Sequence, residues 1–183
     1  MVSGTAGREE VLFSEVQRFK QKWLWLAVIA AAASAWFAAI CQLFGRNSLG
    51  GLSTLDWLIL FVWLFIGLGL PALFITATLR VEVRDDGIYY RYYPFHRRFH
   101  RIASDEIEKA EARTYRPIAE YGGWGIRGGW GKSGKAYNVY GDRGVQLELV
   151  GGKRILFGSQ KAGEFAAAIH NAMQRWGRRP APS

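Results

Sequence analysis

Apolar residues are distributed unevenly along this chain, because residues 23–45 and 57–79 contain no charged side chain. At 1.5 Å per helical residue, the apolar runs over residues 23–44 and 57–79 each span roughly 33 Å, enough for a hydrocarbon core of about 30 Å. The linker between the runs is short and rich in glycine and serine. We therefore predict two transmembrane helices that form an antiparallel hairpin over residues 23–79.

Small residues recur at every fourth position of the first run, which places Ala27, Ala31, Ala35 and Ala39 on one helical face. Such faces let helix backbones approach closely in lipid. We expect this face to pack against the second helix of the same hairpin; the alternative is a contact with a second copy or a partner. In the second helix, Pro71 predicts a kink.

The segment before the first run also shows helical spacing, because Leu12, Val16, Phe19 and Trp23 share one face and charged residues surround the other. This pattern is typical of an amphipathic helix that lies in the membrane interface. We predict such a helix over residues 1–22; the alternative is a plain helical extension of the first span.

After the second run the period changes to alternation, which indicates strands. Seven strands are predicted, around Val81 and Val83 and over residues 88–93, 98–103, 107–115, 135–140, 145–150 and 154–157. Ser159 is a suitable N-cap for a final helix, in which Phe165, Ile169, Ala172 and Trp176 form one apolar face. Residues 80–176 are therefore predicted to form one domain, followed by a tail over residues 177–183.

This order of elements resembles bacterial membrane proteins that carry a pleckstrin-homology-like (bPH) domain behind a two-helix hairpin. The segments LRVEVRDDGIYYRYYPF, GGWGIR and GVQLELVGGKRILFGSQ and the closing helix carry the resemblance. It implies an α+β membrane protein with a seven-stranded PH-like β-barrel or sandwich and a C-terminal helix. It also implies a scaffold without a stated activity. In lipid-binding relatives the first hairpin loop is basic, whereas here it is the acidic turn Asp85-Asp86-Gly87, so phosphoinositide binding at this loop is not expected.

The formal net charge is +9, of which residues 80–183 contribute +8 through 19 basic and 11 acidic side chains. Basic residues flank the hairpin on both outer sides, whereas its linker holds Arg46 against Asp56. The positive-inside rule then places both termini in the cytoplasm and the chain in the cytoplasmic (inner) membrane.

Motifs for catalysis or cofactor binding are weak. Residues 122–133, GGWGIRGGWGKS, match nucleotide-binding fingerprints in letters, without the required helix or glycine spacing. His96 and His100 have no neighbouring cysteine or carboxylate to complete a metal site. We therefore expect no enzyme activity, no cofactor and no metal. Nucleic acid is not expected as a partner, because the bilayer is the nearer polyanion.

If the strands run alternately away from and toward the membrane, the loops over residues 94–101, 115–134 and 151–153 lie near the lipid, and the turns at 85–87, 104–106 and 141–144 lie away from it. Phe99 and Tyr121 then suit the headgroup level. The residues predicted to face lipid or a partner are Arg97, Arg98, Arg101, Arg116, Trp124, Arg127, Trp130, Lys132, Lys135, Lys153 and Arg154.

These features favour a membrane-anchored, non-enzymatic PH-like module for interaction or assembly. Its expected partners are anionic lipid headgroups, another membrane protein or further copies of the chain. The alternative is an accessory subunit or small-ligand sensor that uses the Gly/Trp-rich loop 121–134 as a pocket lid. An apolar pocket beneath Trp124 and Trp130 would favour a ligand, and a flat basic surface would favour docking.

Overall fold

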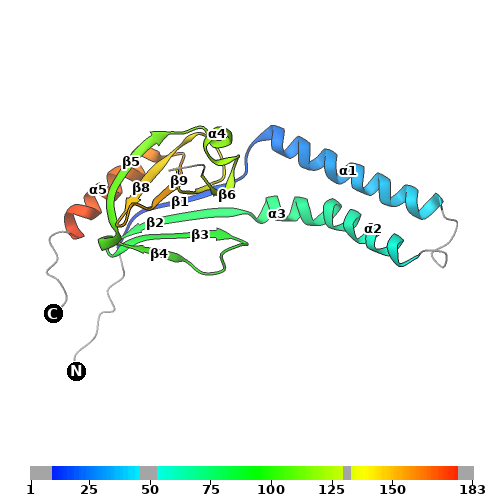
Figure 1. Ribbon diagram of the computed structural model, residues 1–183, viewed down its shortest axis with the longest axis horizontal. Coiled ribbons are helices and arrows are strands. Elements are labelled where there is room, and N and C mark those ends of the chain that lie inside the picture. Colours follow the sequence, from blue (N-terminus) through cyan, green and yellow to red (C-terminus); the bar gives the residue numbers. More distant parts are fainter. Residues whose placement is uncertain (1–9, 46–52, 130–132, 177–183) are drawn as a thin grey trace, which may run out of the picture. The chain divides into compact units, whose positions relative to one another are not determined.

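The computed structural model describes residues 10–45, 53–129 and 133–176, and these residues form two compact units. The helical unit lies within residues 19–77, and the globular unit combines residues 10–18 with residues 78–176 (Figure 1). The globular unit is therefore discontinuous in sequence, because the helical unit is inserted within it.

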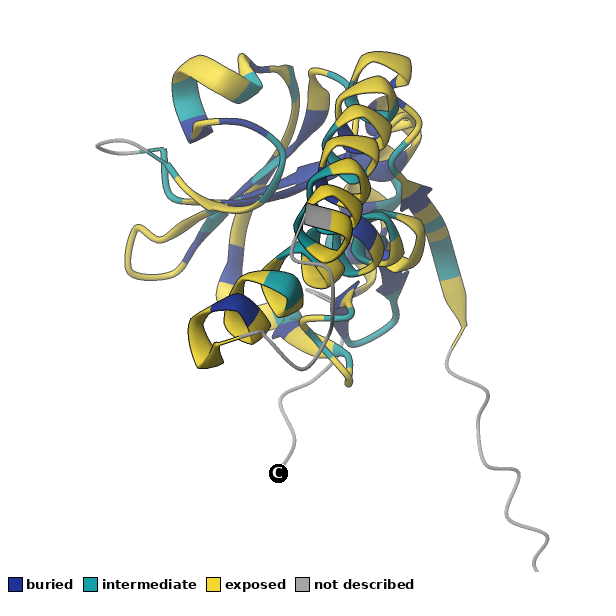
Figure 2. Ribbon diagram, turned by 90° about the vertical axis from the view of Figure 1, so that its right-hand side faces the viewer, coloured by how far each residue is buried: buried dark blue, intermediate teal, exposed yellow. Residues whose placement is uncertain are grey.

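The helical unit contains α1 (Lys22–Gly45) and a second helical stretch made of α2 (Thr54–Leu64), the π-helical turn η2 (Phe65–Gly69) and α3 (Leu70–Thr76). Both stretches are long and apolar enough to cross a membrane, and only 17% and 6% of their most apolar windows are buried (Figure 2). The core helix of a soluble protein would be mostly buried. The two predicted apolar helices are confirmed as helices.

The second helix has different ends from those predicted. It begins at Thr54 because Ser53 and Asp56 form a capping box, in which the Asp56 carboxylate accepts from the Ser53 backbone at 2.9 Å and the Asp56 N–H donates to the Ser53 hydroxyl at 3.3 Å. It ends at Thr76, because Thr78 already belongs to a strand.

The buried face of α1 is centred on Val28 and Ala35; Ala31 and Ala39 are half-buried and Ala27 is exposed. In the second stretch, where a kink was predicted at Pro71, a π-turn directly precedes the proline, and the Leu70 N–H donates to the Phe65 carbonyl.

Gly67, within that π-turn, permits a close helix contact. A β-carbon at this position would lie 2.8 Å from the indole nitrogen of Trp36, so a larger residue would require the Trp36 ring to shift.

The first sheet of the globular unit contains β1 (Val11–Arg18), β2 (Thr78–Arg84), β3 (Gly87–Tyr93) and β4 (His100–Ala103), in that spatial order. β1 and β2 are antiparallel, and Arg18 lies opposite Thr78. The two ends of the helical unit therefore leave from directly paired positions on neighbouring strands.

The prediction of an amphipathic helix over residues 1–22 is wrong for residues 11–18, which form β1. Phe13 points inward and stacks on Phe165 with ring centroids 4.9 Å apart, and Gln17 donates to the Gly158 carbonyl at 2.6 Å. Residues 11–18 form a strand because the backbone N–H and C=O groups at the edge of β2 pair with theirs, which a helix could not do. The domain boundary predicted at residue 80 is corrected accordingly, because β1 belongs to the globular unit.

The second sheet contains β5 (Ile107–Thr114), β6 (Gly125–Gly128), β7 (Lys135–Asn138), β8 (Arg143–Leu149) and β9 (Arg154–Gly158), in the order β5-β8-β9-β7-β6. The short helices η3 (Ser104–Glu106) and α4 (Pro117–Tyr121) precede and follow β5. Seven strands lie near their predicted positions, whereas β1 and β6 were not predicted. Within the described residues the two sheets do not close into a barrel.

The core lies between the two sheets and beneath α5 (Ala162–Trp176), which packs on β1, β2, β5 and β8. The predicted apolar face of this helix is confirmed for Phe165, Ile169 and Ala172, which are fully buried; the Trp176 side chain lies outside the described residues.

The predicted alternation of strand directions is wrong after β5. β7 is parallel to β9, and β9 and β5 are both antiparallel to β8, so β7 runs in the same direction as β5. The unpredicted strand β6 provides the extra reversal. As a result the Tyr115 N–H donates to the Asp142 carbonyl at 2.7 Å, and the Val150 N–H donates to the Glu106 carbonyl at 2.9 Å. Turns predicted at opposite ends therefore lie together.

Candidate functional site

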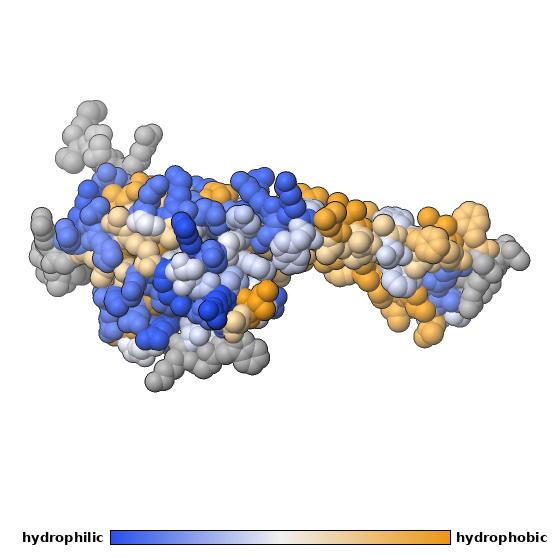
Figure 3. All heavy atoms as spheres, turned by 90° about the horizontal axis from the view of Figure 1, so that it is seen from above, coloured by the Kyte–Doolittle hydropathy of each residue, from blue (hydrophilic) through white to orange (hydrophobic). Residues whose placement is uncertain are grey.

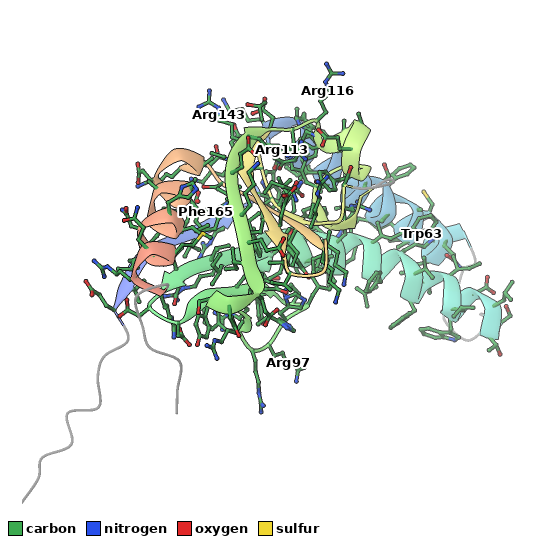
Figure 4. The ribbon with its side chains drawn as sticks, turned by 60° about the vertical axis from the view of Figure 1, so that its left-hand side comes forward. Trp63, Arg97, Arg113, Arg116, Arg143 and Phe165 are labelled. Carbon is green, nitrogen blue, oxygen red and sulfur yellow. The ribbon has the colours of Figure 1, made fainter. Side chains whose placement is uncertain are left out.

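The predicted lipid-facing residues that the structure describes do not form one surface. Arg97 and Arg98 are exposed in the loop after β3, and Arg101 forms an ion pair with Asp86 at 3.0 Å. Arg116 is exposed at the start of α4; Figure 4 shows it on the side of the globular unit that also carries Arg143, with Arg97 on the opposite side. Trp130 and Lys132 lie outside the described residues.

In the described part of the glycine-rich segment, Tyr121 and Trp124 contact the rest of the globular unit. The Trp124 indole donates to the Gly141 carbonyl at 2.9 Å, and the Arg127 guanidinium donates to the Trp124 carbonyl at 3.0 Å. Tyr121 is 2% exposed and packs with Tyr115, so its predicted place at the headgroup level is wrong. Lys135, Lys153 and Arg154 form a third group, around a cavity at the opposite end of the second sheet.

A different basic surface occupies the outer side of the first sheet. On β2, alternation turns Leu79, Val81 and Val83 inward, where all three are buried, and Arg80 and Arg84 outward. The register places Arg91 of β3 opposite Arg80. Arg18 of β1 lies opposite Thr78, which is two residues before Arg80 on β2 and therefore on the same face. These four arginines, Arg18, Arg80, Arg84 and Arg91, are called the arginine face below.

One buried carboxylate organises the middle of the arginine face. Glu82 is 2% exposed, and its oxygens lie 2.7 Å from Arg80 Nε and 2.6 Å from Arg84 Nη2. Ion pairs with this geometry hold guanidinium groups in fixed orientations. Four arginines around one glutamate leave a local excess of three positive charges.

An aromatic ring covers part of the same guanidinium groups. The Phe99 ring centroid lies 5.0 Å from Arg91 Cζ and 5.8 Å from Cζ of both Arg80 and Arg84. These cation–π contacts restrict the arginines further. Phe99 was predicted to suit the headgroup level, and the structure places it beside the basic surface rather than in the core.

The end of the arginine face nearest the helical connections contains a pocket of about 250 Å³. Arg18, Arg80 and Arg91 line it, together with the residues Val16, Thr78 and Tyr93. Within the part of the chain that the structure describes, no carboxylate pairs with Arg18 or Arg91. The guanidinium groups of these arginines, beside the hydroxyls of Thr78 and Tyr93, form a donor set suited to phosphate or carboxylate oxygens.

Comparison with known families assigns the chain over most of its length. Residues 6–176 match the model of DUF6141, a family of unknown function. The chain belongs to DUF6141. No curated protein and no solved structure matches it.

In this DUF6141 chain, Arg18, Arg80, Arg84 and Arg91 are among the basic residues on the outer sides of the hairpin, which the sequence alone indicated only as markers of orientation. A usable signal was present, since Arg80, Glu82 and Arg84 alternate within one strand and therefore share a face. The contribution of Arg18 required knowledge of β1.

The described residues of this DUF6141 member contain no group of three or more histidine, cysteine, aspartate or glutamate side chains arranged to hold a metal ion. His96 and His100 are neighbours, with ring centroids 4.2 Å apart, and both lie against aromatic rings: His96 against Tyr137 and His100 against Tyr90. Burial lowers the pKa of His96, and the nearby His100 lowers it further. The arginine face is the candidate functional site, because Glu82 and Phe99 orient three of its arginines and three of the four line a pocket.

Proposed function

We propose that this chain spans the cytoplasmic membrane twice and that its globular unit is a non-enzymatic module that binds anionic lipid headgroups through the arginine face. The carrying observation is the direct continuity of β1 and β2 with the apolar helices. Arg18 precedes the first residue of α1, Lys22, by four residues, and Thr78 follows Thr76 by two. Extended chain of those lengths reaches at most about 14 Å and about 7 Å.

These short connections support a position of the arginine face near the headgroups. Apolar side chains cover the helical unit, and hydrophilic ones gather over the globular unit (Figure 3). Basic residues near an anionic leaflet each contribute about 1 kcal/mol, so a net excess of three charges corresponds to about 3 kcal/mol. That value is roughly a hundredfold in lipid preference, and it decreases with added salt.

The pairing of β1 with β2 also supports a common side for both ends of the hairpin, because Arg18 and Thr78 are opposite one another. The positive-inside rule favours the cytoplasmic side, where anionic lipids are enriched. Two sheets followed by a C-terminal helix agree with a PH-like domain in which the hairpin is inserted between the first two strands. A membrane protein partner or a second copy is the alternative occupant of the arginine face.

The test uses the full chain in vesicles that contain spin-labelled phosphatidylglycerol or phosphatidylcholine. We expect a preference for phosphatidylglycerol of roughly a hundredfold at low salt, which decreases as salt is added. The double variant Arg18→Gln/Arg91→Gln should lose most of this preference. The control, Arg116→Gln/Arg143→Gln, removes the same charge from another surface and should retain it. Equal losses in both variants, or no preference in the wild type, would contradict the proposal.

A further inference from the structure

A second site lies between the two sheets, on the inner side of β3 rather than on the arginine face. It is a cavity of about 680 Å³, called the inter-sheet cavity, and its lining residues are Tyr90, Gly134, Lys135, Tyr137, Gly152, Lys153, Arg154 and Ile155. We infer that the inter-sheet cavity binds a small amphipathic anion, with an apolar or aromatic body and one carboxylate or phosphate group. This site is independent of the proposed headgroup binding.

The inner wall of the cavity is aromatic. The rings of Tyr90 and Tyr137 lie 4.8 Å apart, and each also contacts Phe157, at 5.0 Å and 5.6 Å. Burial raises the pKa of Tyr90, and a hydrogen bond with Tyr137 raises it further. The Tyr90 hydroxyl is neutral at physiological pH, so the wall is aromatic and adds no negative charge.

The rim of the cavity is cationic. Lys135 precedes Tyr137 by two residues on β7, so alternation places both side chains on the inner side of the second sheet. Within the described residues, neither Lys135 nor Lys153 pairs with a carboxylate. Arg154 differs, because its guanidinium lies 2.7 Å from Glu148 and is already neutralised. Two ammonium groups are therefore left to recognise an anion.

The backbone at the rim is fixed by a close approach. Gly134 has φ of +74°, and a β-carbon there would lie 2.1 Å from the Arg154 carbonyl oxygen, so β7 and β9 meet closely at the mouth. Among the described residues of loop 121–134, Gly134 lines the cavity. The Trp124 indole instead donates to the Gly141 carbonyl, away from the cavity lining. The loop thus contributes to the rim and not, through Trp124, to a lid.

Size and chemistry together define the ligand class. Small-molecule sites typically measure about 300–1,000 Å³ and combine apolar walls with a few polar groups. Inorganic phosphate would leave the aromatic wall without a partner, and a neutral aromatic molecule would leave both ammonium groups unpaired. An amphipathic anion satisfies both parts of the site.

The test uses the full chain in nanodiscs of neutral phosphatidylcholine, with empty nanodiscs as the reference for partitioning. Isothermal titration calorimetry is carried out with three probes: 1-naphthyl phosphate, 1-naphthol and inorganic phosphate. We expect 1-naphthyl phosphate to bind with one-to-one stoichiometry, and each of the other two probes to bind at least tenfold more weakly.

Variants then locate the binding. Lys135→Gln/Lys153→Gln should weaken 1-naphthyl phosphate binding at least tenfold. The control Lys109→Gln/Lys161→Gln removes two exposed lysines elsewhere on the globular unit and should bind as the wild type does. Both variants change exposed side chains, and a thermal unfolding midpoint checks that each is folded. No binding of 1-naphthyl phosphate, equally tight binding of inorganic phosphate, or an unaffected Lys135→Gln/Lys153→Gln variant would overturn the inference.

Discussion

Because Arg18 and Thr78 are directly opposite on antiparallel strands, the helical unit can be replaced by a tight turn. We predict that a chain in which Asn-Gly joins Arg18 to Thr78, in place of residues 19–77, folds as a water-soluble globular unit. A two-residue Asn-Gly loop is the connection that antiparallel neighbours favour. A fragment that starts at Thr78 contains the rest of the globular unit but lacks β1, and it should not fold stably.

The difference in stability between the joined chain and the fragment from Thr78 follows from the contacts that β1 makes. Phe13 is half-buried against Phe165, and removing such a ring costs about 2 kcal/mol, around half of the value for a fully buried one. Losing Gln17 leaves the buried Gly158 carbonyl without its partner, at a cost of about 1–3 kcal/mol.

Glu15 adds a contact at the start of the final helix. Its carboxylate accepts from the Ser159 hydroxyl at 2.5 Å and from the Gln160 N–H at 2.9 Å, and hydrogen bonds to a charged group are worth about 1.5–3 kcal/mol each. The loss of β1 therefore amounts to about 6 kcal/mol or more. That is comparable to the whole stability of a typical domain, about 5–15 kcal/mol.

Urea unfolding followed by far-ultraviolet circular dichroism measures this difference. The joined chain should unfold in one cooperative transition, and Gln17→Ala within it should reduce the free energy of unfolding by about 1–3 kcal/mol. The fragment from Thr78 should show no cooperative transition. If that fragment unfolds as cooperatively and at the same urea concentration as the joined chain, β1 is not part of the folded core and the reasoning fails.

Three further predictions concern single side chains of the globular unit. Glu82→Gln leaves two guanidinium groups without their shared carboxylate and should lower the free energy of unfolding by about 2 kcal/mol in urea, with Glu164→Gln as an exposed control that changes little. Gly144→Ala places a β-carbon 2.5 Å from a backbone carbonyl oxygen and should destabilise by about 2 kcal/mol, whereas Gly163→Ala, in open space on α5, should stabilise by about 0.5–1 kcal/mol. Because the pKa of His96 is lowered in the folded state, the unfolded chain binds this proton more readily; stability should fall as the pH drops below about 6.5, and His96→Gln should show a smaller fall in thermal midpoint.

The helices and most strands were predictable because their signals are local. A charge-free run longer than twenty residues leaves few options other than a helix, and strict alternation such as that around Val81 and Val83 defines a strand face. β1 was not predictable in the same way, because residues 11–18 are compatible with either period. What decides its conformation is a partner, β2, that lies on the other side of the helical unit in the sequence.

The prediction of which loops share one surface failed for a different reason. Predicted loop positions depended on counting strands, and one four-residue strand of sequence GIRG, β6, was hidden in a glycine-rich segment. Its insertion reverses the direction of every later strand, so Lys153 moves to the end opposite Arg116. The arginine face depends less on counting, since it needs only alternation on β2 and the pairing of β2 with its neighbours.

Tethering determines how strong each proposed site has to be. If the chain spans the membrane as proposed, a globular unit attached by two short connections faces that membrane at high effective concentration, and weak attraction by a few arginines would be sufficient to hold one surface against anionic lipid. A ligand of the inter-sheet cavity, as inferred above, would arrive from solution and gain nothing from such a tether. Its affinity must come from the site itself, and the inter-sheet cavity accordingly combines an aromatic wall with two ammonium groups, where the arginine face offers mainly charge.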